Sequence, residues 1–190
     1  MKYEEKPRQI PDGRYYVKIT NDDDKRVFVQ LNNTHLVDNG DEDVTLTLSE
    51  SNQAKIREYD AQNISTAKTH CENWFGKQLA EKTLETAYSK SLTETSMNVS
   101  KIVVKNKVHT KIYDHTKEEV ELTGEQNCDV ILELSGLWFM KKTYGPVWRL
   151  VQVRLKAPPK KKVYVHDEYM FQDDDQEADG GGESSDDDFF

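Results

Sequence analysis

Short runs of alternating apolar and polar residues recur along this chain and predict a mainly β protein. Residues 43–48, DVTLTL, alternate strictly and are rich in β-branched side chains, which favours a strand. Comparable runs at residues 15–19, 26–31, 101–107, 111–114 and 128–134 predict further strands. Asn32-Asn33 is typical of a turn, because Asn tolerates the left-handed conformation.

Residues 136–156, GLWFMKKTYGPVWRLVQVRLK, predict two more strands that carry many aromatic and basic residues. Tyr144-Gly145-Pro146 is typical of the turn between them, since Gly tolerates positive φ and Pro fixes φ without donating a hydrogen bond. Ser135-Gly136 predicts a bulge or kink just before this stretch. Period-two alternation places Trp148, Leu150, Gln152, Arg154 and Lys156 on one face of the last strand, and Val151, Val153 and Leu155 on the core face.

A helical pattern separates the early strands from the late ones. Ser49 is a suitable N-cap, and residues 54–67 have mainly helical propensity. Apolar residues recur at intervals of three to five over residues 73–91, which predicts an amphipathic helix. We therefore expect a helical insert at about residues 50–92.

Together these elements predict a mainly β, OB-like small barrel of about five to seven strands with an inserted helical region. A β-sandwich is the alternative. Residues 1–13 are expected to form an N-terminal arm, residues 14–165 the OB-like nucleic-acid-binding domain, and residues 166–190 a disordered acidic tail.

The net charge of −9 is concentrated in the tail. Nine of the 35 acidic residues and none of the 26 basic residues lie within residues 172–190, so the rest of the chain carries equal numbers of both. The acidic composition therefore does not argue against binding nucleic acid.

The end of the sequence suggests two roles for the tail. Phe189 and Phe190 follow Asp186, Asp187 and Asp188, so two apolar rings could enter a pocket of a partner while the acids lie on its basic rim. The acids could also occupy the basic surface of the domain when nucleic acid is absent. A tail that only improves solubility is the alternative.

The block SGLWFMKKTYGPVWRLVQVRLK, within a match over residues 130–156, resembles the C-terminal core of OB-fold single-stranded DNA-binding proteins of the large nucleocytoplasmic DNA virus type. That group is related to the single-stranded DNA-binding proteins of short-tailed phages with acidic, Phe-ended tails. Residues 101–114 match more weakly, and the N-terminal 90 residues match only in general organisation. The resemblance implies a role in DNA replication, recombination and repair, with DNA polymerase or helicase–primase recruited through the tail.

Exposed aromatic rings and cations are the residue types that bind single strands, by stacking on bases and neutralising phosphates. The candidate aromatic contacts are Trp148, Trp138, Tyr144 and Tyr113, with Phe28 as a further ring; Trp138 could equally belong to the core. The candidate phosphate contacts are Arg154, Arg149, Lys141, Lys142, Lys105, Lys107 and Lys111. Stacking and phosphate contacts serve DNA and RNA alike, and the oligomeric state, including a homo-oligomer, is left open.

Other chemistry finds little support in the sequence. His70-Cys71 and Cys128 lack the spacing of a metal site, so neither a metal nor a cofactor is expected. Acidic runs such as Asp22-Asp23-Asp24 have no accompanying base or phosphate-binding glycine loop, so no enzyme is expected, and a nuclease or deaminase-like enzyme is the weakest reading. An acidic-tailed chaperone or interaction protein for basic partners is the main alternative.

The compartment is predicted from two further features. Two cysteines are too few for a disulfide framework, which favours reduced thiols in an intracellular protein. The sequence shows neither an apolar signal segment nor a run long enough to span a membrane. We therefore expect an intracellular location, in the host cytoplasm or nucleus if the protein is viral.

Overall fold

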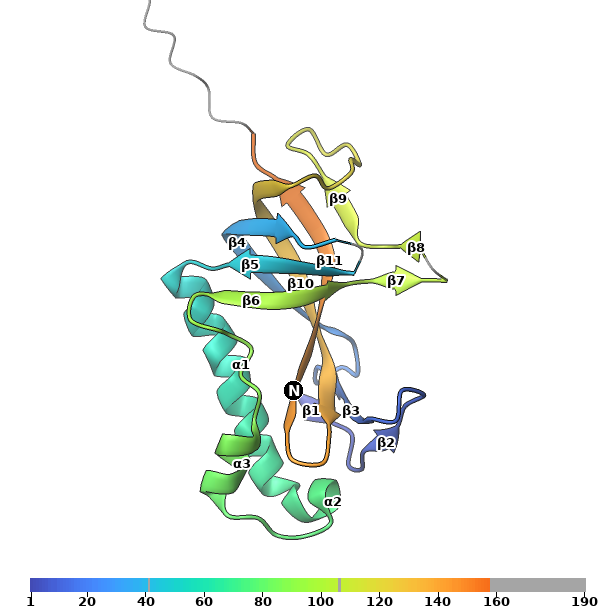
Figure 1. The fold of residues 1–190 in the computed structure, drawn as a ribbon, viewed down its shortest axis with the longest axis vertical. Helices are drawn as coiled ribbons and strands as arrows, with labels where there is room; N and C mark the ends of the chain where they lie inside the picture. The colour runs from blue at the N-terminus through green and yellow to red at the C-terminus, as the bar shows by residue number, and fades with distance from the viewer. Residues whose placement is uncertain (41, 106, 158–190) are drawn as a thin grey trace, which may run out of the picture. The chain divides into compact units, whose positions relative to one another are not determined.

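The computed structural model describes residues 1–40, 42–105 and 107–157. In chain order the elements are β1 Lys2–Tyr3, β2 Arg8–Gln9, β3 Tyr15–Thr20, β4 Val27–Asp38, β5 Asp43–Thr47, α1 Glu50–Thr69, α2 Cys71–Phe75, α3 Glu81–Ala87, β6 Ser96–Lys101, β7 Val103–Val104, β8 Lys107–Val108, β9 Lys111–Tyr113, β10 Glu125–Phe139 and β11 Tyr144–Leu155 (Figure 1). The predicted tail, including Asp186, Asp187, Asp188, Phe189 and Phe190, lies outside the described residues.

Five strands close into a ring. β4 pairs with β10 and with β5, β5 pairs with β6, β6 pairs with β11, and β11 returns to β10. The β6–β11 contact is parallel, and the other four are antiparallel. A closed, five-stranded barrel is the OB-like architecture, so the predicted fold class is confirmed and the sandwich alternative is wrong.

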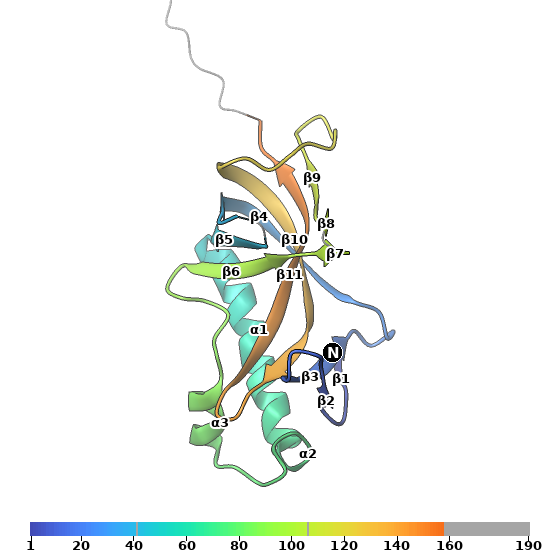
Figure 2. The ribbon, with the colours of Figure 1, turned by 45° about the vertical axis from the view of Figure 1, so that its right-hand side comes forward.

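Two additions extend the barrel. β9 pairs with the same strand, β11, as β6 does, but farther along it. The β7–β8 hairpin connects β6 to β9 and projects from the barrel wall (Figures 1 and 2). β3 pairs with the far half of β10, from Gly136 to Phe139, and its other edge pairs with β1 and β2. Residues 1–13, predicted as an arm, therefore contribute two short strands to the sheet.

The barrel interior is filled by aliphatic side chains that alternate along its strands. Leu31, Leu46, Val99, Leu132 and Leu150 come from the five different strands, and each is at most 1% exposed. Burying such side chains contributes about 1.5–3 kcal/mol each, which makes this the main source of stability.

The helices pack against the far end of the β10–β11 hairpin (Figure 2). The predicted insert is confirmed in outline, but its second helix is divided, because Gly76 ends α2 in the left-handed conformation at φ 69°. Trp74 and Phe75 of α2 each meet Phe139 edge to face, with ring centroids 5.6 Å apart. Tyr144 stacks on Phe139 at 5.7 Å, so the tip of the hairpin is anchored by an aromatic cluster.

Asn32-Asn33 was expected to be a turn, and that prediction is wrong. β4 continues through it, and the pairs Cys128–Thr34 and Val130–Leu31 show one extra residue on β4. Asn33 has φ 53°, so the left-handed conformation occurs here within a β-bulge. The bulge predicted at Ser135-Gly136 is confirmed by a register shift between Leu134 and Gly136.

The turn of the long hairpin lies at residues 140–143, where the Met140 N–H donates to the Thr143 carbonyl at 2.8 Å. Gly145 and Pro146 belong to β11 and pair with Trp138 and Leu137, so the prediction of a turn there is wrong. Gly145 is required for another reason. A Cβ at this position would meet the Ser89 Cβ at 2.9 Å, because the helical insert passes close to the strand.

A third bulge changes which residues of β11 face the core. Ile131 pairs with Gln152 and Leu132 with Leu150, which leaves Val151 as the extra residue. Alternation is therefore interrupted at Val151. Trp148 and Leu150 are buried before it and Val153 after it, while Val151 and Leu155 are only partly buried. The predicted assignment of faces along this strand is wrong before the bulge and correct for Val153.

No helix among the described residues has the length and apolar character needed to cross a membrane.

Candidate nucleic-acid interface

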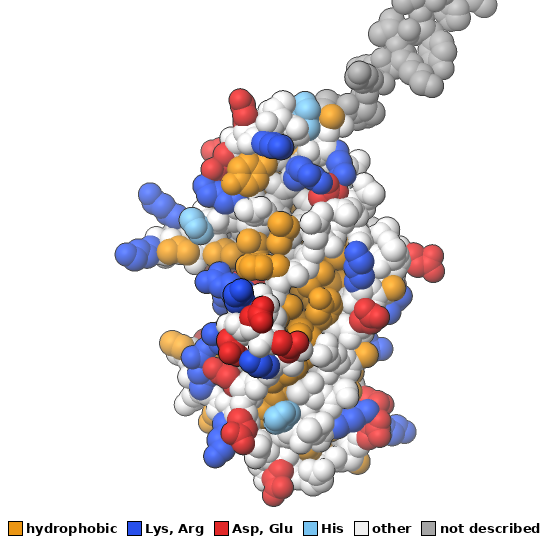
Figure 3. Space-filling model, turned by 180° about the vertical axis from the view of Figure 1, so that it is seen from behind, with side chains coloured by type: hydrophobic (Ala, Val, Ile, Leu, Met, Phe, Trp, Pro, Cys, Tyr) orange, Lys and Arg blue, Asp and Glu red, His pale blue; other side chains and the backbone are white. Residues whose placement is uncertain are grey.

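A groove crosses the outer face of the β10–β11 hairpin, between β3 on one side and β6 on the other. It consists of two adjoining hollows of about 450 and 370 Å³ that share Ile10, Tyr16 and Arg149. We call it the basic groove; its polar and aromatic lining includes Arg8, Arg14, Tyr16, Lys18, Arg26, Lys90, Asn98, Ser100, Trp138 and Arg149. Figure 3 shows one face of the molecule, with hydrophobic side chains along its middle and basic and acidic side chains interspersed around them.

Tyr16 is held rigidly in this groove. Its ring lies against Gly136, where a Cβ would come within 2.4 Å of the ring. Its hydroxyl donates to the Ser135 carbonyl at 2.5 Å, and the Arg8 guanidinium lies over the ring at 5.5 Å from the centroid. Burial raises the pKa of Tyr16, so the hydroxyl stays protonated and continues to donate. The ring is therefore fixed in position, with a cation over it.

Trp138 and Arg149 complete the centre of the groove. Trp138 is half-buried and pairs in register with Tyr16, so the two rings lie on neighbouring strands. Arg149 is exposed and stands opposite Glu133. The Glu133 side chain is buried, and its Oε2 has no hydrogen-bond partner among the described residues. Arg26 lies 3.8 Å from the other oxygen of this carboxylate.

Cations outnumber acids around the groove. Arg8, Arg14, Lys18, Arg26, Lys90 and Arg149 supply six positive charges. Asp24 and Glu133 also line it, and two further acids, Glu4 and Asp12, pair with Arg8 and Arg14. The remaining excess is positive and lies beside two partly exposed rings, which is the combination that single strands require.

Residues 32–173 match the model of a protein family described as Family of unknown function (DUF5871). The chain belongs to this family. No curated protein matches the sequence.

Among solved structures, this chain is similar to the single-stranded DNA-binding protein from bacteriophage Enc34. The complex of that protein with ssDNA has a TM-score of 0.45 and 9% identity, over 80% of this chain and 95% of that chain. Its C-terminal truncation has a TM-score of 0.44 and 9% identity, over 80% and 94% of the two chains. A third structure of the phage protein has a TM-score of 0.44 and 11% identity, over 87% and 96%.

Trp148 was predicted to stack on bases, but the structure buries it. The side chain is 5% exposed and meets the Tyr59 ring edge to face at 5.7 Å. Its indole N–H donates to Ser91 Oγ at 2.8 Å, and Ser91 Oγ in turn donates to Asp60 at 2.5 Å. Trp148 also lines one hollow of the basic groove, but its ring is packed against Tyr59 and leaves little surface on which a base could stack.

Tyr144 was predicted as a nucleic-acid contact and is also buried. It is fully covered by Phe75, Tyr88 and Phe139, with which its ring makes centroid distances of 5.2–5.7 Å. Burial raises the pKa of Tyr144, and its hydroxyl has no hydrogen-bond partner in the described part of the chain. This ring belongs to the packing between hairpin and helices.

Of the other predicted contacts, only Arg149 and Trp138 line the basic groove. Lys141 and Lys142 are exposed at the turn of the long hairpin, and Lys105 and Lys107 are exposed on the β7–β8 hairpin. Lys111 pairs with Glu119 at 2.5 Å. Tyr113 and Arg154 line a separate cleft, so the predicted residues do not form one surface.

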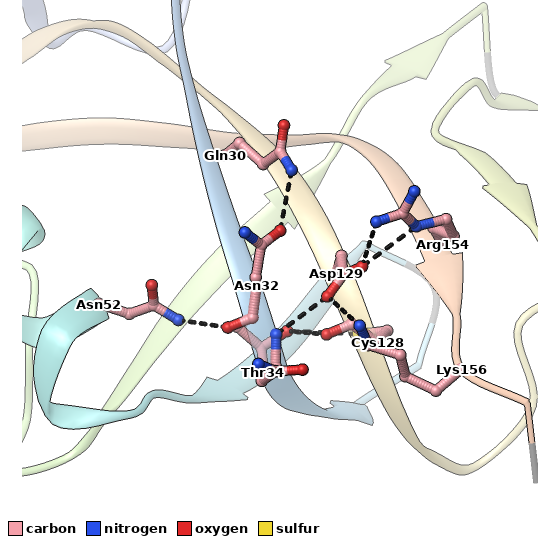
Figure 4. A network of polar contacts seen from close by, with 9 residues as sticks. Gln30, Asn32, Thr34, Asn52, Cys128, Asp129, Arg154 and Lys156 are labelled. Atoms are coloured by element: carbon pink, nitrogen blue, oxygen red, sulfur yellow. Dashed lines mark hydrogen bonds and ion pairs between the residues drawn. The ribbon is translucent and has the colours of Figure 1, made fainter.

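Arg154 belongs to a polar network centred on Asp129 (Figure 4). Asp129 Oδ2 accepts Arg154 Nε at 3.1 Å and Nη2 at 2.5 Å, while Oδ1 accepts the Asn33 N–H at 3.0 Å and lies 2.7 Å from Lys156 Nζ. Burial alone would raise the pKa of Asp129, but the hydrogen bonds outweigh it and lower the pKa to about 2.

The contacts predicted from the sequence did not include Tyr16 or the cations Arg8, Arg14, Lys18, Arg26 and Lys90. One local signal was available, because alternation puts Tyr16 and Lys18 on the same face of their strand. Their meeting with Arg149 depends on the pairing of β3 with β10. The pattern within the first strand does not contain that information.

Cys71 and Cys128 are both buried free thiols. Within residues 1–40, 42–105 and 107–157, no three His, Cys, Asp or Glu side chains gather as the ligands of a metal ion would.

Proposed function

We propose that this protein binds single-stranded nucleic acid, with single-stranded DNA as its main ligand, along the basic groove. The observation that carries the proposal is the pair of neighbouring rings, Tyr16 and Trp138, set among six cations on the outer face of a small barrel. Stacking is tolerant of sequence because every base has a π-face, and phosphate contacts carry no sequence information. Binding in the groove is therefore expected to show little sequence preference.

The biological setting belongs to the same proposal. The resemblance of residues 130–156 to viral single-stranded DNA-binding proteins supports a role in DNA replication, recombination and repair, without enzymatic activity. We assign to the acidic segment, residues 173–188, competition for the groove. Asp186, Asp187, Asp188, Phe189 and Phe190 are assigned to docking DNA polymerase or helicase–primase.

The test compares groove variants with matched controls in the full-length protein. Trp138→Leu should weaken binding of a labelled single-stranded oligonucleotide by about 5–150-fold, since stacking contributes roughly 1–3 kcal/mol per base. Arg149→Ala should weaken binding and reduce its dependence on salt by about one phosphate contact. Fluorescence anisotropy at two salt concentrations measures both effects.

Two controls remove similar groups outside the groove. Tyr15→Leu removes an exposed ring on the opposite face of β3, and Lys82→Ala removes an exposed cation on α3. Neither should change affinity by more than about twofold. Equal binding of duplex and single strands, or no binding of either, would reject the proposal and favour the acidic interaction protein.

A further inference from the structure

A second cleft, of about 340 Å³, lies farther along the hairpin from the basic groove and is bordered by β9. Ile131 pairs with Gln30 of β4 on one side and with Gln152 of β11 on the other. These three residues therefore form a row across three strands, with an apolar side chain between two carboxamides. Tyr113 pairs with Arg154 beside this row and adds an aromatic ring.

The carboxamides and the guanidinium retain hydrogen-bonding capacity. Gln30 Nε2 donates to Asn32 Oδ1 at 2.8 Å, which fixes the orientation of the amide. Gln30 Oε1 and the amide of Gln152 make no hydrogen bond among the described residues. Arg154 uses Nε and Nη2 to bind Asp129, so the hydrogens of Nη1 remain available at a fixed position (Figure 4).

The charges of this cleft differ from those of the basic groove. Lys117 and Arg154 are balanced by Asp114 and Asp129. The Asp114 carboxylate is already occupied by the Thr116 N–H at 2.7 Å and the Glu118 N–H at 3.0 Å. A balanced lining gives no general attraction for an anion. It suits a flat, neutral group that carries donors and acceptors along its edge.

We propose that this cleft holds one unpaired nucleobase of the bound strand. The base lies between the Tyr113 ring and Ile131, its polar edge is bonded by Gln30 and Gln152, and Arg154 contacts the adjoining phosphate. Carboxamides can pair in a bidentate manner with a base edge, and one such pairing discriminates by about 1–3 kcal/mol. The inference rests on the proposed function, because a strand in the groove brings unpaired bases to the hairpin. The cleft then adds a preference at one nucleotide to binding that is otherwise tolerant of sequence.

The direct test uses the full-length protein labelled with ¹⁵N and each of the four deoxynucleoside monophosphates. The side-chain amide signals of Gln30 and Gln152, assigned from Gln30→Leu and Gln152→Leu, should shift on titration, with unequal affinities for the four nucleotides. The amide of Gln78, exposed between α2 and α3, serves as the control signal and should not move. Unmoved Gln30 and Gln152 signals, or four equal affinities, would overturn the inference.

A second measurement separates the cleft from the groove. The wild-type protein should prefer one of the homopolymeric oligonucleotides by about 5–150-fold, and Gln152→Leu should reduce this preference to within about twofold. Gln78→Leu should leave it unchanged. If Gln152→Leu keeps the preference, the inference fails while the proposed function stands. If no oligonucleotide binds but mononucleotides shift both amides, the proposed function fails while the cleft is supported.

Discussion

Asp129 shows how a single buried carboxylate can organise the residues around it. It is 5% exposed and receives donors from β4, from β11 and from the residue after β11. The bulge at Asn33 is what turns a backbone N–H toward it. One side chain therefore links the irregularity of β4 to the position of Arg154.

The low pKa of Asp129 predicts acid sensitivity. The pKa is about 2 in the folded protein and about 3.9 in an unfolded chain, so the carboxylate stabilises the fold fully above pH 4 and loses this effect as the pH falls toward 2. Asp129→Asn should lower the free energy of unfolding by about 2.5 kcal/mol at pH 7 and by much less near pH 2. Urea unfolding at both pH values measures this.

Asp23→Asn is the matched control, because that carboxylate is exposed in the turn before β4. It should have little effect at either pH. An equal loss for Asp129→Asn at both pH values would show that packing, and not the charge, is responsible.

At the scale of single residues, alternation predicts the side that a residue faces only until a bulge occurs. Val153 was placed correctly, but Trp148 was placed on the wrong face because Val151 is an extra residue. A bulge depends on the register of the partner strand, which the local sequence does not contain. The burial of Trp148 could therefore not be derived from the pattern of β11 alone.

Among the elements, β10 depends most on one small residue, Gly136. A Cβ there would approach the Val17 carbonyl oxygen to 2.2 Å and the Tyr16 ring to 2.4 Å, so β3 and Tyr16 would both have to shift. Gly136→Ala should destabilise the protein by about 1–3 kcal/mol through overpacking. It should also weaken single-strand binding, because Tyr16 is displaced from the groove.

Thermal unfolding together with oligonucleotide binding tests this prediction. Gly124→Ala is a suitable comparison, since a Cβ there would meet nothing within 4 Å. Its φ of 58° is left-handed, so Ala at this position is strained by its backbone conformation and not by overpacking. A Gly136→Ala protein with unchanged affinity would show that Tyr16 can move without loss of binding.

The elements themselves were largely predictable, and their lengths were not. The strands at residues 15–20 and 43–47 were located from alternation. β4 is far longer than expected, because Asn32-Asn33 looks like a turn in the sequence and is a bulge in the sheet. β10 runs through the bulge that was predicted at Ser135-Gly136. Gly145 was interpreted as a turn residue, whereas its small size serves the contact with Ser89.

On the scale of the whole molecule, the candidate site was the least predictable feature. The basic groove combines residues before β3, on β3, before β6 and on the last hairpin. Arg149 and Trp138 were found because they lie in a stretch with an unusual composition. Arg8, Lys18 and Lys90 join them only through tertiary structure.

The distribution of charge over the chain gives a prediction at this scale. A full-length variant in which the nine acids of residues 173–188 become Asn or Gln should bind single strands several-fold more tightly at low salt. The gain should disappear at about 0.5 M salt, where the competition is screened. Anisotropy titrations at both salt concentrations measure it.

Glu50→Gln with Glu58→Gln, which removes exposed charge from α1, is the control and should have little effect. If the variant without these nine acids binds single strands as tightly as the wild type or more weakly, the acids do not compete for the groove.

The closed ring of strands also has a consequence for how the chain is made. β4 finds its partner β10 about 100 residues later, and the ring closes only through β11, near the end of the described residues. During synthesis, β4 lacks its partner β10 and β6 lacks its partner β11 until the hairpin has left the ribosome. Closure of the barrel is therefore expected to begin only after the β10–β11 hairpin has been synthesised, with formation of this hairpin as the step that commits the nascent chain to its fold.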